Sequence, residues 1–202
     1  RQIHGTFALR QKVMNLFELD EKVFSFLYGL ASKNQLLDWL SVFLADYLFY
    51  ILILVFLWVV FKERNWRRRF YLAALTGIAI ILSRGIATPV IRFLYDRPRP
   101  FIADNIEPLI NHVSTNSFPS GHLAILVPIV LTLFLINRRL GYWFFIGAIL
   151  IGIGRVATGV HWPSDIIGGI LVGTVSFLAT YYLLKLKGVA TNVRTSHQGQ
   201  ES

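Results

Sequence analysis

The chain contains no cysteine, a single methionine and few charged residues among its 202 positions. The absence of cysteine excludes disulfide bonds, thiolate metal sites and a cysteine nucleophile. Charged residues make up 15% of the chain and hydrophobic residues 54%, whereas soluble domains average about 25% charged and about 45–50% apolar residues. A soluble fold of this composition would lack polar surface, so the composition favours a membrane protein.

Five long apolar runs account for this composition. They are residues 47–61, 70–83, 123–136, 140–154 and 166–184. The first run extends back to residue 40 if Asp46 is tolerated near one end, and the second continues to residue 91 past Arg84. A helix needs roughly 20 residues to cross the hydrocarbon core, and each run approaches that length once its polar ends are included. The runs lack the polar face that a soluble bundle requires. We therefore expect an all-α, polytopic membrane bundle of about five to six transmembrane helices.

The flanking segments divide the chain further. Residues 14–39 hold a short apolar stretch between charged residues, which is typical of an amphipathic helix lying in the membrane interface. Met14 is the only methionine, so residues 1–13 are expected to be an extra N-terminal segment. We assign residues 40–188 to the transmembrane domain and residues 189–202 to a flexible C-terminal tail.

Basic residues outnumber acidic ones by 20 to 11, and three basic clusters flank the spans: two lie in connections and one follows the last span. Five crossings place all three clusters on one side, which is the cytoplasmic side by the positive-inside rule. The clusters lie in 62–69, in 138–139 and at 185 and 187. Because topology explains most of the charge, we expect no nucleic-acid partner.

The two connections on the opposite side carry polar residues that topology does not explain. Guanidinium groups match phosphate oxygens, and a Ser-Gly-His sequence before the third span resembles a helix N-terminus open to an anion. Taken singly, Ser120 could be an ordinary helix cap and His161 an ordinary interfacial residue. Together the set favours a phosphate site. It comprises Arg92, Arg97, Arg99, Ser120, Gly121, His122, Arg155, His161 and Asp165.

Asp165 follows His161 by four residues, in the first turn of the last span if Pro163 begins that helix. A carboxylate there would hold one ring nitrogen and leave the other free to attack. Arg97 is expected to pair with Asp96, and contact with a second phosphate is the alternative. Arg84, inside a span, has no assigned role.

A metal site is the alternative for the same residues. No pair of histidines has a zinc-type spacing, and the arginines would repel a dication. We therefore expect no metal and no other cofactor. The candidate ligands are His112, His122, His161, Asp96, Asp104 and Asp165.

Three ordered motifs resemble the signature of the type 2 phosphatidic acid phosphatases, which are integral-membrane, metal-independent lipid phosphatases. That signature is Lys-x6-Arg-Pro, then Pro-Ser-Gly-His, then Ser-Arg-x5-His-x3-Asp. The chain departs from it at Arg92, in place of lysine, and at Gly154, in place of serine. Here the motifs read Arg92-x6-Arg99-Pro100, Pro119-Ser120-Gly121-His122 and Gly154-Arg155-x5-His161-x3-Asp165.

The resemblance implies a phosphohistidine mechanism. His161 would be the nucleophile, Asp165 the carboxylate that orients it, and His122 the general acid. The substrate would be a membrane lipid phosphate, with no obligate protein partner, and the site would face outward from the bacterial cytoplasmic membrane. The phosphate oxygens would be bound by Arg92, Arg99, Ser120, Gly121 and Arg155.

Within the family the chain looks most like bacterial undecaprenyl-diphosphate phosphatases, which remove the terminal phosphate of the cell-wall carrier lipid. This likeness rests on the compact length, the N-terminal segment ending in Leu36-Leu37-Asp38-Trp39, and Arg99-Pro100-Phe101. Phosphatidylglycerophosphate or phosphatidic acid phosphatase is the alternative function. A transporter or a non-catalytic lipid-phosphate binder is more remote, because two related halves with paired broken helices are not evident.

Overall fold

The computed structural model describes residues 2–113 and 116–186, with side chains from residue 17 onward. The expected C-terminal tail lies outside the described residues. All the regular secondary structure of the described part is helical, which confirms the all-α prediction. The helices are α1 (Gln2–Ala31), α2 (Gln35–Val42), α3 (Leu48–Lys62), α4 (Trp66–Ile80), α5 (Thr88–Leu94), α6 (Pro100–Ala103), α7 (Gly121–Ile136), α8 (Arg138–Ala157) and α9 (Pro163–Leu186).

Two π-helical segments each join two α-helices into one longer stretch. Segment η1 (Phe43–Tyr47) joins α2 to α3, and segment η2 (Ile81–Ala87) joins α4 to α5. The chain therefore continues without a loop from Gln35 to Lys62 and from Trp66 to Leu94. π-helical turns in such positions frequently occur at functional sites.

The five predicted spans all fall on helices of the structure. By length and composition, four described stretches can cross a membrane: Gln35–Lys62, Trp66–Leu94, Arg138–Ala157 and Pro163–Leu186. The fifth, α7, is apolar but has 16 residues, about 24 Å of helix against about 30 Å of hydrocarbon. The first stretch begins earlier than expected because Asn34 caps it, accepting a hydrogen bond from the backbone N–H of Leu37 at 3.0 Å.

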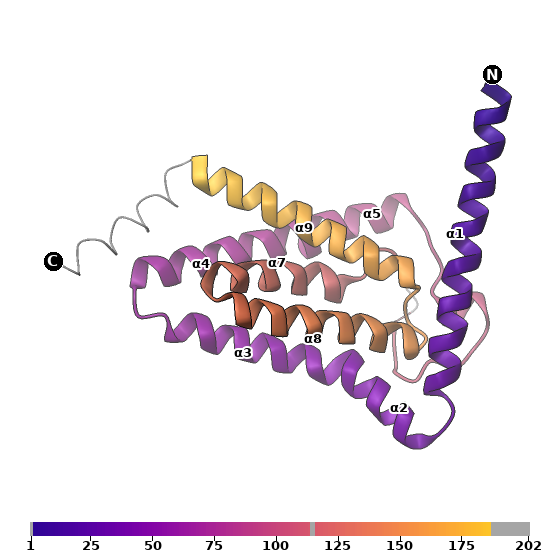
Figure 1. The fold of residues 1–202 in the computed structure, drawn as a ribbon, viewed down its shortest axis with the longest axis horizontal. Helices are drawn as coiled ribbons and strands as arrows, with labels where there is room; N and C mark the ends of the chain where they lie inside the picture. Colours follow the sequence, from indigo (N-terminus) through magenta and orange to yellow (C-terminus); the bar gives the residue numbers. More distant parts are fainter. Residues whose placement is uncertain (1, 114–115, 187–202) are drawn as a thin grey trace.

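The basic clusters and the candidate phosphate site lie at opposite ends of the bundle. In Figure 1 the α3–α4 and α7–α8 connections and the end of α9 lie toward the left, whereas α5 ends and the α8–α9 connection runs on the right. Asn65 and Asn137 begin α4 and α8 at the left-hand end, because their side chains accept hydrogen bonds from the first backbone N–H groups of those helices. The described residues of the three basic clusters are therefore separated from the site, as the topology argument predicted.

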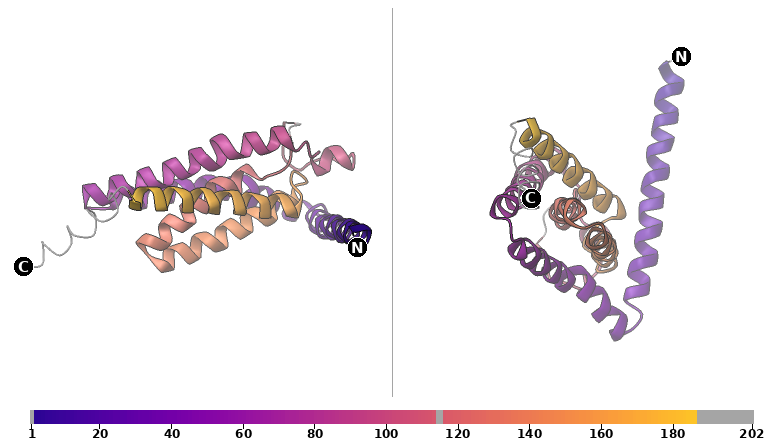
Figure 2. Two further views of the ribbon diagram at one scale, coloured as in Figure 1. Left: turned by 90° about the horizontal axis from the view of Figure 1, so that it is seen from above. Right: turned by 60° about the vertical axis from the view of Figure 1, so that its left-hand side comes forward.

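Helix α1 lies across the site end of the bundle, at a large angle to the other helices (Figures 1 and 2). It is held there by Phe24, whose ring centroid lies 5.0 Å from that of Trp162, and by Asp20, which accepts a hydrogen bond from Ser164 N at 2.8 Å. A crosswise helix suits the membrane interface, and the interfacial assignment of residues 14–39 stays a prediction.

Helix α7 is surrounded by other helices of the bundle (Figure 2). Its buried leucines and isoleucines pack with aromatic and aliphatic side chains of α3 and α8. On the α9 side, a Cβ atom at Gly169 would lie 2.5 Å from the Ser120 carbonyl oxygen, and one at Gly173 would lie 2.8 Å from the Cβ of Val127. Small residues let membrane helices approach closely. The starts of α7 and α9, which carry the candidate residues, are thereby held together.

Candidate active site

His161 lies in the connection between α8 and α9 and is 1% exposed. Its Nδ1 atom is 3.2 Å from Oδ2 of Asp165, and its Nε2 atom is 3.4 Å from Nη1 of Arg99. A guanidinium group can only donate, so we assign the lone pair to Nε2 and the proton to Nδ1. Burial and the charges of Arg155 and Arg99 lower the pKa of His161 well below its ordinary 6.5. The ring is therefore neutral near pH 7, with Nε2 available for attack.

Asp165 orients this ring from the first turn of α9, which begins at Pro163 as predicted. Its Oδ2 atom also accepts a hydrogen bond from the backbone N–H of Trp162 at 2.8 Å. Its own backbone carbonyl accepts a hydrogen bond from Ser120 N at 2.9 Å. The carboxylate is thus fixed against the His161 loop, and the backbone of Asp165 joins that loop to the start of α7.

The pairing predicted for Arg97 with Asp96 is wrong. Arg97 instead donates hydrogen bonds to Asp165 at 2.9 Å and to Asp20 of α1 at 2.5 Å. Asp20 is also hydrogen-bonded to Ser164, 144 residues further along the chain. This set of contacts ties α1 to the carboxylate that orients the histidine. Sequence reasoning missed Asp20, because nothing distinguishes it from the other acidic residues of α1.

Several buried polar atoms of the predicted phosphate ligands lack a partner within the described part of the chain. They are Nε and Nη2 of Arg155, Nε of Arg92 and Oγ of Ser120. Both arginines are close enough to act electrostatically on His161. An unpaired buried polar group is costly and calls for an explanation. Charge-assisted hydrogen bonds to phosphate oxygens would satisfy these donors.

The three guanidinium groups predicted to bind phosphate converge at this site. Arg99 is buried and donates to the carbonyl oxygen of Val160 at 2.7 Å, and Arg92 donates to that of Pro119 at 3.0 Å. Burial and the charges of Arg92 and Arg155 lower the pKa of Arg99 to about 10, which leaves it cationic at neutral pH. A phosphate anion bound among these like charges would relieve their mutual repulsion.

The predicted helix start at Ser120 is confirmed, since α7 begins at Gly121. The Ser120 side chain makes no capping hydrogen bond there, so the ordinary-cap interpretation is not supported. His122 occupies the first turn, with its ring centroid 4.4 Å from that of Phe49. His161 is close enough to act electrostatically on His122. The structure therefore brings both imidazoles to the same end of the bundle.

Two charged residues of the spans belong to this neighbourhood although sequence reasoning did not place them there. Asp46 in η1 accepts a hydrogen bond from Arg155 Nη1 at 2.8 Å. Arg84 in η2 lies against Gly121, where a Cβ atom would come within 2.6 Å of the Arg84 Nε atom. The available signal was a lone charge inside an apolar run, which in membrane proteins usually marks function.

The alternative metal ligands do not converge. Among residues 2–113 and 116–186 there is no group of three or more histidine, aspartate or glutamate side chains placed to hold a metal ion. Asp96 and Asp104 are exposed. His112 does approach the site, with its ring centroid 6.4 Å from that of His161, and burial and the charge of Arg99 lower the pKa of His112 to about 4. The surroundings are thus cationic and suit an anion.

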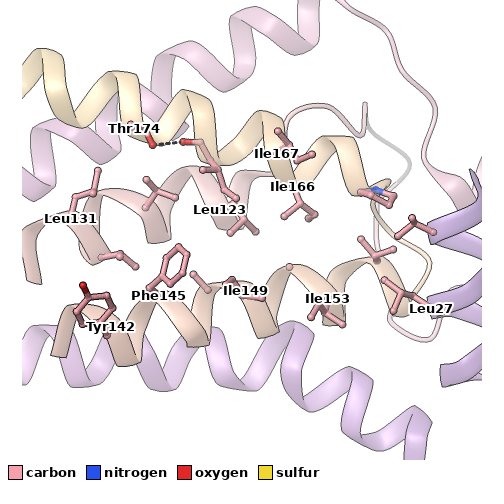
Figure 3. A pocket seen from close by; sticks show the side chains of 18 of the residues that line it. Leu27, Leu123, Leu131, Tyr142, Phe145, Ile149, Ile153, Ile166, Ile167 and Thr174 are labelled. Carbon is pink, nitrogen blue, oxygen red and sulfur yellow. Dashed lines mark hydrogen bonds between the residues drawn. The ribbon is translucent and has the colours of Figure 1, made fainter. Parts of the chain in front are cut away.

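An apolar groove of about 540 Å³ runs between α7, α8 and α9 (Figure 3). Leu27 of α1 lies at its site end and Tyr142 of α8 toward the other end. The hydroxyl of Thr174, one of its few polar lining groups, is hydrogen-bonded to the backbone of its own helix at 2.8 Å. This lining suits hydrocarbon chains of the bilayer and has no charged group for a phosphate.

Gly154, which replaces the family serine, packs against the backbone of η1. A Cβ atom there would lie 2.7 Å from the nitrogen of Ala45 and 2.9 Å from the carbonyl carbon of Leu44. We expect Gly154→Ser to separate α8 from η1 and to destabilise the fold by about 1–3 kcal/mol, as overpacking does. Thermal unfolding in detergent measures this, with Gly77→Ser as the matched control because a Cβ atom there has open space. An equal unfolding temperature for the two variants would contradict the packing argument.

Comparison with known proteins identifies the family. Residues 70–188 match the model of the PAP2 superfamily. The chain is 32% identical to undecaprenyl-diphosphatase BcrC of Bacillus subtilis over 159 residues, covering 78% of this chain and 80% of that protein. It is 30% identical to the bacitracin transport permease protein BcrC of Bacillus licheniformis over 172 residues, covering 84% of this chain and 82% of that protein.

The crystal structure of LpxE from Aquifex aeolicus has the same fold. It superposes with a TM-score of 0.65 at 23% identity, covering 81% of this chain and 95% of that one. The family match includes all three motifs, from Arg92 to Asp165, and confirms the resemblance that they carried. The chain therefore belongs to the PAP2 superfamily and is a membrane-embedded lipid phosphatase.

Proposed function

We propose that the chain hydrolyses undecaprenyl diphosphate to undecaprenyl phosphate and inorganic phosphate through a phosphohistidine. The observation that carries the proposal is the set of buried, unpartnered donors of Arg92 and Arg155 beside the neutral imidazole of His161. Such a set supplies a nucleophile and preorganised positive charge for one phosphoryl group. The choice of lipid draws on the likeness to the undecaprenyl-diphosphatase of Bacillus subtilis.

In the first step, Nε2 of His161 attacks the terminal phosphorus atom. A nitrogen–phosphorus bond forms, and the bond from phosphorus to the bridging oxygen breaks, leaving its electron pair on that oxygen. His122 donates a proton to the departing oxygen and can therefore accept one in the second step. Asp165 accepts the Nδ1–H hydrogen bond throughout and stabilises the positive ring of the intermediate, as in other oriented histidines.

In the second step, water attacks the phosphohistidine. The nitrogen–phosphorus bond breaks and its electrons return to Nε2, while His122 accepts a proton from the water. Inorganic phosphate leaves, and His161 is neutral again with its proton on Nδ1. The guanidinium groups of Arg92, Arg99 and Arg155 hold the phosphoryl oxygens in both steps, so neither step requires them to rearrange.

The proposed site faces outward from the cytoplasmic membrane. The described basic clusters lie at the end of the bundle opposite the site (Figure 1), and such clusters mark the cytoplasmic side of membrane proteins. A carrier lipid released by cell-wall synthesis outside the cell would present its diphosphate at this face. The proposed role is therefore recycling of that carrier.

Phosphate release by the purified protein in detergent tests this function. With a chelator present, we expect release from undecaprenyl diphosphate with a higher kcat/KM than from phosphatidylglycerophosphate at equal surface concentration. The reverse preference would favour the glycerolipid function. Loss of activity on chelation would point to metal chemistry, and no release from any lipid phosphate would favour a binder or transporter.

A further inference from the structure

Arg84 is the single charged residue between Arg69 and Arg92 in a helical stretch that can cross the membrane. It lies in the π-helical segment η2 and is exposed. Within the described residues, its guanidinium group has no hydrogen bond and no carboxylate partner. An unpaired charge at such a position is expensive in a bilayer and marks a functional contact.

The Arg84 side chain lies over the backbone at the start of α7. A Cβ atom at Gly121 would come within 2.6 Å of the Arg84 Nε atom and 3.1 Å of its Cδ atom. Segment η2 is held to α7 by Ser83, whose hydroxyl donates to the carbonyl oxygen of Ala124 at 2.7 Å. Arg84 is therefore next to the Ser-Gly-His motif, and it acts electrostatically on His122 and on Arg92.

Arg84 approaches the site from the membrane-spanning part of its helical stretch. It precedes Arg92 by eight residues in one continuous stretch that ends at Leu94, at the site end. Eight helical residues correspond to a displacement on the order of 10 Å along the axis. The side chain thus reaches the edge of the phosphate site that faces the hydrocarbon core.

We propose that Arg84 binds the lipid-linked phosphate of a diphosphate substrate, while Arg92, Arg99 and Arg155 hold the terminal phosphate. This inference rests on the proposed function. A lipid diphosphate enters with its chain in the bilayer, so its lipid-linked phosphate lies on the membrane side of the terminal one. When the bond to the bridging oxygen breaks, the electron pair stays on the lipid phosphate, and Arg84 stabilises that charge. Arg84 thereby selects diphosphates over monophosphates.

Binding to a variant without the nucleophile tests this assignment apart from catalysis. In a His161→Ala background, farnesyl diphosphate and farnesyl monophosphate serve as probes. We expect Arg84→Gln to weaken the diphosphate by about 10- to 100-fold, the value of a charge-assisted hydrogen bond. Binding of the monophosphate is expected to stay within about threefold, and Arg84→Lys to recover part of the loss because it keeps the charge.

Arg138→Gln is the matched control, since Arg138 is an exposed arginine at the opposite end of the bundle. It should change the affinity for neither probe. Equal weakening of both probes by Arg84→Gln, or no weakening of either, would overturn the assignment. Thermal unfolding of each variant shows whether the fold persists. If Arg84→Gln does not fold, the affinities of Arg84→Lys for the two probes are compared with those of the His161→Ala protein instead. Phosphate release that survives His161→Ala would contradict the proposed mechanism and not the role of Arg84. The ratio of diphosphate to monophosphate affinity still tests Arg84 in that case, because it is measured by binding.

Discussion

Replacing His161 by alanine is expected to abolish phosphate release, with a fall in kcat of about 10⁴- to 10⁶-fold, the range seen when a covalent nucleophile is removed. The reason is the geometry of its two nitrogens: Nδ1 is held by Asp165 at 3.2 Å and Nε2 faces Arg99 at 3.4 Å. No other described imidazole has a carboxylate on one nitrogen and a guanidinium group at the other. The measurement is single-turnover phosphate release, together with trapping of phosphate on the protein.

His112→Ala is the matched control for this variant. His112 is the histidine whose ring centroid lies 6.4 Å from that of His161, but the structure records a backbone carbonyl, and no carboxylate, as its hydrogen-bond partner. We expect it to keep kcat within about tenfold, because it removes neither the nucleophile nor a phosphate ligand. Near-normal turnover by His161→Ala, or covalent phosphate still trapped on that variant, would refute the nucleophile assignment.

Replacing Asp165 by asparagine is expected to lower kcat by about 10³- to 10⁴-fold, as when the orienting carboxylate of other catalytic histidines is removed. The amide has one acceptor oxygen, whereas the carboxylate accepts from His161, from Trp162 N and from Arg97. One of these donors therefore faces the NH2 group of the new asparagine. The imidazole of His161 is then no longer held with its proton on Nδ1 and in its native orientation. KM should change little because the predicted phosphate ligands remain in place.

A purely structural role for Asp165 would give a different result. Asp20→Asn is the informative comparison, since it weakens the other carboxylate partner of Arg97 and leaves the His161–Asp165 contact intact. We expect that variant to lower the unfolding temperature while keeping most of kcat per folded molecule. If Asp165→Asn also lowered only the unfolding temperature, Asp165 would be a packing residue and the proposed orienting role would fail.

The helices and motifs were predictable because they depend on local properties of the chain. Apolar run length predicted the five apolar helical stretches, four of which are long enough to cross a membrane, since the cost of placing a residue in hydrocarbon is roughly additive along a helix. The order of the three motifs predicted the family, which the match over residues 70–188 confirms. The roles of His122, His161 and Asp165 stay predictions, although the structure places them at one end of the bundle.

The sequence by itself determined which residues are apolar, charged or nucleophilic, and therefore the all-helical membrane fold and the chemistry available to it. Only the tertiary structure decided the partners of the buried charges: Asp20 and Asp165 for Arg97, Asp46 for Arg155, and the place of Arg84 beside Gly121. Asp46 and Arg155 are 109 residues apart. Coulomb energy depends on distance in space and on local burial, and neither follows from distance along the chain.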